Sequence, residues 1–190
     1  MIGLPSPEDV HRFWFGPDAA APEVLATHSK RWFNGGKDFD RELTEKFLPL
    51  LETLSAGPLA RDWAERGVRQ RLAAILVLDQ MSRNIFRSSP RAFAQDMLAL
   101  HLCKDGLDAG DDAQLSEVER IFFYLPLEHS EAMEDQARSV ELFAALAAEA
   151  RKPFREFAVM THDYARKHLE VIRTFGRFPH RNAAVGRVST

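Results

Sequence analysis

The hydrophobic residues of this chain recur at helical spacing in a series of segments separated by short turns. Ser6 and Pro7 are typical of a helix start, and Gly16 is typical of a helix end. Similar signals recur along the chain. They predict helices from residue 7 to the glycine at 16, over 22–32, 38–55, 58–65 and 68–82, from 90 to the glycine at 106, from the capping box after Ser116, over 131–150, and from 153 to the glycine at 176.

No alternation of period two persists between turn signals, so no strand is predicted. Consecutive helices joined by short turns lie antiparallel, which predicts an all-α fold of antiparallel helical hairpins, either bundled or stacked as a short solenoid. The chain shows no 34-residue consensus repeat, so a tetratricopeptide-like arrangement must be degenerate. At 190 residues, without a linker or low-complexity stretch, the chain is expected to form a single helical domain over residues 1–190.

Residues 72–78 are apolar on every side of the predicted helix, which is typical of a central, fully surrounded helix. Asp79 follows directly and therefore starts near the interior. A carboxylate there needs a partner, and Arg83 lies one turn away. Gln80 and Asn84 repeat that spacing on the adjoining face.

Three polar stretches stand beside apolar sequence: residues 79–84, residues 128–131 with 135–136 behind them, and residues 180–182. Such side chains are costly in apolar surroundings unless they pair with one another or form a site. We therefore expect the three stretches to meet in space. Within the first, Asp79 and Arg83 have two interpretations: a guanidinium presented as an anion clamp, or an ion pair that only satisfies a helix end.

Residues 124–131 are predicted to form a loop between two helices, with Ser130 capping the second helix and its first-turn amides open to an anion. Glu128 beside His129 is expected to fix the tautomer of the imidazole, as a general base requires. Glu131 and the acidic and basic residues that follow it are interpreted as a solvated ladder of ion pairs, which involves Asp135 and Arg138.

His180, Arg181 and Asn182 follow a glycine stop and a proline, so they are predicted to lie on a rigid turn from which they can converge on one ligand. The alternative is an exposed polar turn. Two further histidines, His162 and His168, fall in apolar stripes of the last long helix and are interpreted as core residues.

Composition narrows the possible partners. A formal net charge of −3 argues against binding to nucleic acid, and the longest apolar run is too short to span a bilayer. No signal peptide is recognisable and Cys103 has no partner for a disulfide, which indicates the cytoplasm and a buried structural thiol. The chain has one Glu-x-x-His motif where a di-iron bundle needs two, and no His-Glu-x-x-His, so neither a metal site nor a cofactor is predicted.

The order of the polar stretches resembles a bacterial family of small all-helical proteins known only as a domain of unknown function, number nine-two-four. The matching strings are LDQ at 78–80, RNIFR at 83–87, PRAF at 90–93, FYLPLEHSE at 123–131 with DQ at 135–136, and GRFPHRN at 176–182. The resemblance implies a tetratricopeptide-like helical fold and no particular activity.

Three functional hypotheses follow. The first is a groove that binds a small anionic metabolite, either as an enzyme that acts on it or as a binding protein. Its acid–base candidates are His129, Glu128 and His180, and its ligand-binding candidates are Asp79, Arg83, Asn84, Arg181 and Asn182. The second is a protein-interaction module that grips a peptide or an acidic terminus. The third is a structural cluster that locks the packing of three helices. Oligomeric state is not encoded in any of these patterns.

Overall fold

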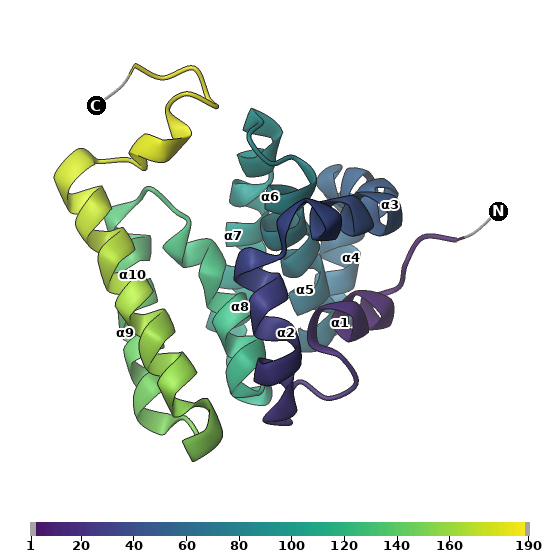
Figure 1. Ribbon diagram of the computed structural model, residues 1–190, viewed down its shortest axis with the longest axis horizontal. Coiled ribbons are helices and arrows are strands. Elements are labelled where there is room, and N and C mark those ends of the chain that lie inside the picture. The colour runs from purple at the N-terminus through teal and green to yellow at the C-terminus, as the bar shows by residue number, and fades with distance from the viewer. Residues whose placement is uncertain (1–2, 189–190) are drawn as a thin grey trace.

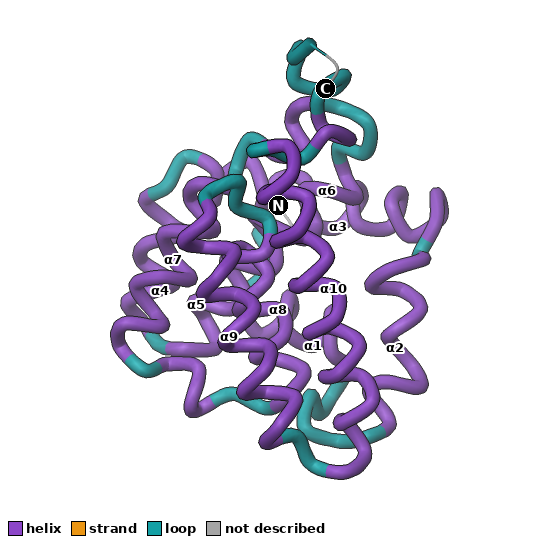
Figure 2. Tube along the Cα trace, turned by 90° about the vertical axis from the view of Figure 1, so that its left-hand side faces the viewer, coloured by secondary structure: helices purple, strands orange, loops and turns teal. Residues whose placement is uncertain are grey.

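The computed structural model describes residues 3–188, and this part of the chain contains helices and turns but no strand (Figures 1 and 2). The α-helices are α1 (Pro7–Phe15), α2 (Glu23–Asn34), α3 (Gly36–Ser55), α4 (Pro58–Arg66), α5 (Val68–Ile75), α6 (Ser82–Ile85), α7 (Asp96–Ala109), α8 (Glu117–Glu128), α9 (Met133–Glu149) and α10 (Arg155–Phe175). The predicted all-helical class is confirmed. None of these helices combines the length and apolar character needed to cross a membrane.

Local capping explains where the first helix begins. The Ser6 side chain accepts a hydrogen bond from the backbone of Asp9, and the Asp9 carboxylate accepts one from the Ser6 backbone N–H at 2.8 Å. Without these two hydrogen bonds, the backbone N–H groups of Ser6 and Asp9 would lack an acceptor. Ser116 and Glu119 repeat this arrangement at the start of α8. The sequence signals at these two helix starts are therefore borne out.

The core is one continuous cluster of buried side chains that runs from Val10 to Ala165. Residues 72–78 are all fully buried at its centre, as their apolar character predicted. Phe122 of α8 joins this centre to the N-terminal helices, because its ring centroid lies 5.5 Å from that of Trp14 and 5.0 Å from that of Trp32. The pair α9 and α10 packs against α8 on the other side (Figure 1).

The helix predicted over residues 68–82 is not regular. After α5 the chain forms a π-helix over Leu76–Met81 and then resumes as α6. Propensity does not distinguish these two helical forms, since both suit the same apolar residues. Asp79 and Gln80 both lie in the π-helical stretch, so the interruption falls at the first polar stretch.

The predicted loop over residues 124–131 is wrong, because α8 continues through Pro126 to Glu128. A proline inside a helix costs roughly 3 kcal/mol. Here every residue from Ile121 to Glu128 is buried, and this packing outweighs the local cost. Ser130 is not the cap of α9, which begins at Met133. The Ser130 hydroxyl instead donates to Asp135 at 2.7 Å.

Gly106 does not end a helix either. Residues 90–93 form a separate 3₁₀ turn, and α7 runs through Gly106 to a left-handed Gly110 with φ 75°. Gly106 is a point of close approach, because a Cβ added there would lie 2.5 Å from Cζ of Phe123 and 2.7 Å from Cδ of Arg71. Arg71 is held in place by Asp111 at 2.8 Å.

We expect Gly106→Ala to lower the free energy of unfolding by about 1 kcal/mol. Overpacking against Phe123 and Arg71 costs ~1–3 kcal/mol and exceeds the gain of up to ~1 kcal/mol in helix propensity. Urea denaturation measures the change. Asp105→Ala, at an exposed position of the same helix, should stay within about 0.5 kcal/mol of the parent protein. A stabilised Gly106→Ala variant would show that α7 does not need this close approach.

Candidate functional site

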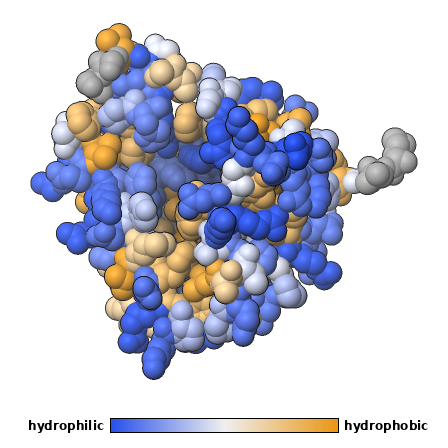
Figure 3. All heavy atoms as spheres, viewed as in Figure 1, coloured by the Kyte–Doolittle hydropathy of each residue, from blue (hydrophilic) through white to orange (hydrophobic). Residues whose placement is uncertain are grey.

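A cavity of about 690 Å³ opens between α2, the π-helix, α8 and α10. One part of its wall is apolar and consists of Phe33, Ile121, Leu125, Phe157, Met160 and Tyr164. The other part carries the polar side chains of Lys30, Gln80, Arg83, Glu128, His129 and His168. Figure 3 shows apolar side chains gathered over the lower part of the gap between α10 and α2, with hydrophilic ones above them. The cavity is therefore two-ended.

At the polar end, Asp79 holds His129. Nδ1 of His129 lies 2.8 Å and 3.0 Å from the two carboxylate oxygens of Asp79. Because an ionised carboxylate only accepts hydrogen bonds, the Nδ1 of His129 carries the proton. Nε2 has no hydrogen-bond partner among residues 3–188, and His129 is one of the residues that line the cavity.

The pKa of Asp79 reflects two opposing effects. Complete burial on its own raises that pKa, but the charges of Arg83 and His129, together with hydrogen bonds from His129 and Gln80, outweigh burial and hold it well below its usual range. Asp79 therefore stays ionised throughout the physiological range. Its position in a π-helix is consistent with a site, because such segments are rare and concentrate where function requires an unusual side-chain direction.

Asp96 of α7 joins two arginines. Its carboxylate lies 3.0 Å from Arg83 and 2.9 Å from Arg181. Arg181 also donates a hydrogen bond to the backbone carbonyl of His129 at 3.0 Å. The guanidinium of Arg181 lies 4.7 Å from the ring centroid of Phe93 and 4.6 Å from that of Phe178. The turn at residues 179–181 is thus fastened to the end of α8 through a buried charge network.

The structure brings the three polar stretches together through Asp79, Arg83, His129 and Arg181, as the sequence predicted. Arg83 also satisfies the expected one-turn spacing, with its Nη1 3.0 Å from Asp79. Arg181 is buried and lies outside the residues that line the cavity.

The other predicted residues lie around this centre rather than in it. Asn84 donates to Asp40 at 2.9 Å and lines a neighbouring cavity of about 490 Å³. His180 is exposed beside Phe178, with ring centroids 5.6 Å apart. Asn182 is buried, and its backbone carbonyl accepts a hydrogen bond from Arg187. Neither His180 nor Asn182 lines these two cavities.

Glu128 does not orient His129. It is buried and pairs instead with His168 of α10, whose Nδ1 lies 2.7 Å from the Glu128 carboxylate. The predicted ladder after it is also wrong, because each member pairs outside α9. Glu131 binds Arg187, Asp135 binds Lys104, and Arg138 binds Asp108.

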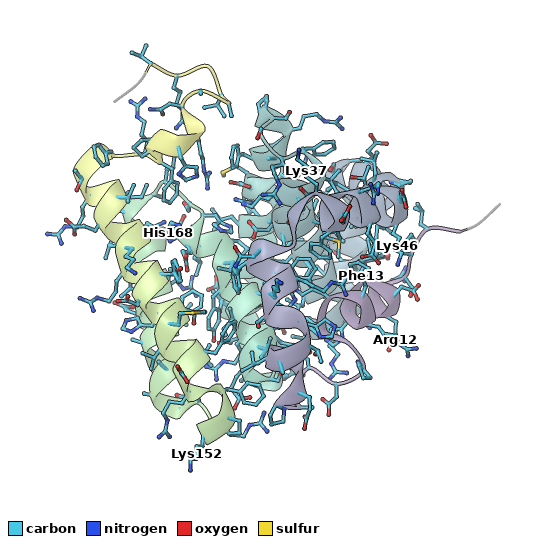
Figure 4. The ribbon with its side chains drawn as sticks, viewed as in Figure 1. Arg12, Phe13, Lys37, Lys46, Lys152 and His168 are labelled. Atoms are coloured by element: carbon cyan, nitrogen blue, oxygen red, sulfur yellow. The ribbon has the colours of Figure 1, made fainter. Side chains whose placement is uncertain are left out.

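The sequence interpretation missed His168, which it assigned to the core. The structure places it on the cavity wall, with 31% of its side chain exposed, on the α10 face next to α8 (Figure 4). Desolvation lowers the pKa of His168, but the hydrogen bond and charge of Glu128 outweigh it and raise the pKa above 6.5. The helical spacing of Thr161, Tyr164 and His168, a polar stripe, was the signal that could have identified it.

A family model described as "Bacterial protein of unknown function (DUF924)" matches residues 10–190. The chain belongs to this family. A solved structure of a protein of unknown function from Agrobacterium tumefaciens is similar to it, with 30% sequence identity and a TM-score of 0.78 over 97% of this chain and 92% of that one. No curated protein matches the DUF924 protein described here. Across residues 3–188, no group of three or more His, Cys, Asp or Glu side chains is arranged to hold a metal ion.

Arg181→Met should destabilise the fold by about 3 kcal/mol, the lower end of the range for breaking a buried ion pair, because Asp96 keeps Arg83 as a partner. Chemical denaturation checks this value. Arg177→Met, four residues earlier and half-buried, is the matched control and should have an effect of under about 1 kcal/mol. Equal stability of the two variants would show that the network around Asp96 contributes nothing.

The pair of Glu128 and His168 predicts a pH dependence of stability. A raised imidazole pKa adds stability below the ordinary value of 6.5, and this stability is lost as the pH rises through the folded-state pKa. The difference in unfolding free energy between the parent protein and Glu128→Gln should therefore narrow by about 1 kcal/mol between roughly pH 5 and pH 9, after allowance for solvent screening. A difference that widens with pH would contradict the pairing.

Proposed function

We propose that this DUF924 protein binds a small molecule with an anionic group in the cavity between α2, α8 and α10, and that His129 serves as an acid–base group there. The observation that carries the proposal is the Asp79–His129 pair, which faces a cavity of about 690 Å³ beside Arg83. A volume of this size lies within the range of roughly 300–1,000 Å³ that is typical of small-molecule sites.

The charges on the wall favour an anion. Arg83 shares its charge with Asp79 and Asp96, so it contributes donors more than net charge. Lys30 is an exposed residue on the opposite wall, and no ion pair joins it to another residue within 3–188. Lys30 is the side chain best placed to balance a carboxylate or phosphate group that accepts hydrogen bonds from Arg83 and His129.

The apolar end of the cavity indicates the chemical character of the part of the ligand that carries no charge. Phe33, Met160 and Tyr164 are between 39% and 51% exposed, although all three are large apolar or aromatic residues. Large apolar side chains gathered along one cavity wall, unlike single ones scattered over a surface, often mark a site that a ligand or partner covers. We therefore infer an amphipathic ligand, with an acidic head at Arg83 and an apolar body against these residues.

We also propose a tetratricopeptide-like arrangement of hairpins, which is supported by the close packing of α4 with α5 and of α9 with α10. Such an arrangement is also compatible with a second candidate function, a groove that binds a peptide with an acidic terminus. The open side of the cavity between α2 and α10 supports this candidate. A cytoplasmic location belongs to the same proposal, as the buried, unpaired Cys103 suggests.

Benzoate, octanoate and phenyl phosphate are suitable probes, because each joins an acidic head to an apolar body. We expect each to raise the melting temperature in a thermal-shift assay, whereas acetate should have little effect. Lys30→Met should weaken binding about fivefold, the effect of losing roughly 1 kcal/mol from a solvent-screened charge.

Lys152→Met is the control for this assay, because Lys152 lies at the end of the α9–α10 pair that is far from His168 (Figure 4). It removes the same charge from the protein without touching the cavity. If no probe raises the melting temperature, or if the two lysine variants behave alike, the anion-binding proposal is wrong. Binding of an acidic peptide but of none of the three probes would favour the second candidate.

A further inference from the structure

Two separate carboxylate–imidazole pairs face the same cavity. Asp79 holds Nδ1 of His129 at 2.8 Å, and Glu128 holds Nδ1 of His168 at 2.7 Å. Both histidines line the cavity, His129 from the end of α8 and His168 from α10. Both carboxylates are buried, so each imidazole is fixed by a group that cannot move into solvent.

We infer that His129 and His168 form a general base and general acid pair that hydrolyses an ester of a small acid bound in this cavity. The inference rests on the proposed function, because the acid that the hydrolysis releases is the anionic ligand of the same two-ended site. It adds an activity, a reaction class and a second catalytic residue, His168, which the sequence interpretation had placed in the core.

The geometry leaves one nitrogen free on each ring. Nδ1 of His129 is occupied by Asp79, and Nδ1 of His168 lies 2.7 Å from Glu128 and 3.0 Å from the backbone carbonyl of Tyr164. Nε2 of neither ring has a hydrogen-bond partner within residues 3–188. Proton exchange with a ligand therefore takes place at Nε2 in both cases. One imidazole can take up a proton and deliver it only later, whereas two imidazoles on different walls can remove one proton and deliver another in the same step.

The surroundings of His168 suit it to the acid role. Desolvation disfavours the protonated form of His168, Glu128 of α8 faces its ring and favours that form, and Arg181 of the following turn adds positive charge and opposes it. The carboxylate outweighs them, since the pKa of His168 is raised despite desolvation. His168 thus keeps its proton to a higher pH than an ordinary histidine does.

The reaction consumes one water molecule. Nε2 of His129 takes a proton from water as the water oxygen forms a bond to the acyl or phosphoryl centre. The bond from that centre to the alcohol oxygen then breaks, and Nε2–H of His168 gives its proton to the departing oxygen. The products are an acid and an alcohol, and proton exchange with solvent returns both histidines to their starting states.

The remaining wall residues match this substrate class. Arg83 and Lys30 line the same cavity, and such groups stabilise the negative charge that develops on the ester oxygens and remains on the acid product. Phe157 and Met160 provide an apolar surface for the acyl or alcohol chain. Hydrolysis of a carboxylic ester and of a phosphoric ester both need this base, this acid and these cationic groups. The experiment below distinguishes the two substrate classes.

The test uses the dependence of rate on the leaving group. p-Nitrophenyl butyrate and ethyl butyrate form one arm, and p-nitrophenyl phosphate and phenyl phosphate form the other. p-Nitrophenolate leaves without a proton, whereas the poorer leaving groups need one. In the arm that the protein hydrolyses, His168→Gln should lose on the order of 100-fold in rate on the poor leaving group and less than about threefold on the p-nitrophenyl compound.

His129→Gln should lose on the order of 100-fold on both compounds, because the base is needed in either case. His162→Gln is the control, since His162 is half-buried on the same helix and lines neither of the two cavities. In Glu128→Gln the alkaline limb of the pH–rate profile should move to lower pH, because the pKa of His168 is no longer raised by the carboxylate. A merely structural role of Glu128 would not cause this shift.

Equal losses by His168→Gln on good and poor leaving groups would remove His168 from the acid role. Hydrolysis of none of the four esters, while benzoate, octanoate and phenyl phosphate still bind, would overturn the hydrolytic pair and leave the binding proposal standing. Absence of both binding and hydrolysis would overturn the two together.

Discussion

The buried carboxylate of Asp79 is the constraint on which the site depends. A charge without solvent access costs several kcal/mol unless donors surround it, so the chain must bring Arg83, His129 and Gln80 to the same point. This requirement ties the π-helix to the end of α8. It also gives His129 one orientation, because its Nδ1 has no better acceptor than the carboxylate.

A second carboxylate extends this arrangement to the end of the chain. Asp96 of α7 pairs with Arg83 and Arg181, and Arg181 reaches the backbone of His129. The turn at residues 179–181 is therefore a brace behind His129 rather than a wall of the cavity. Groups supported in this way by packed helices hold their geometry better than groups on a free loop.

The end of α8 shows why two neighbouring residues serve different partners. Successive residues of a helix point about 100° apart, so Glu128 and His129 cannot pair with each other. Glu128 faces α10 and holds His168, whereas His129 faces the π-helix and meets Asp79. One helix end thus positions both imidazoles, and apolar side chains of α2 and α10 line the other end of the cavity. Membership of the DUF924 family assigns no activity to this arrangement.

Features that depend on neighbouring residues could be predicted from the amino-acid sequence. The capping boxes at Ser6 and Ser116, the absence of period-two alternation and the all-round apolar run at residues 72–78 were sufficient to predict the helical class and its centre. They were also sufficient to indicate that Asp79 needs Arg83, because one helical turn separates the two residues and no tertiary information is required.

Features that depend on distances between helices could not be predicted from the sequence, because they follow from how the helices pack. Pro126 stays inside α8 because the surrounding core holds it there, and Gly106 marks a close approach to Phe123 rather than a helix end. The partners of Glu128 and the place of His168 follow from the packing of α10 on α8. Periodicity reports which face of a helix is buried, but not which helix covers it, and this is why the second imidazole became visible only in three dimensions.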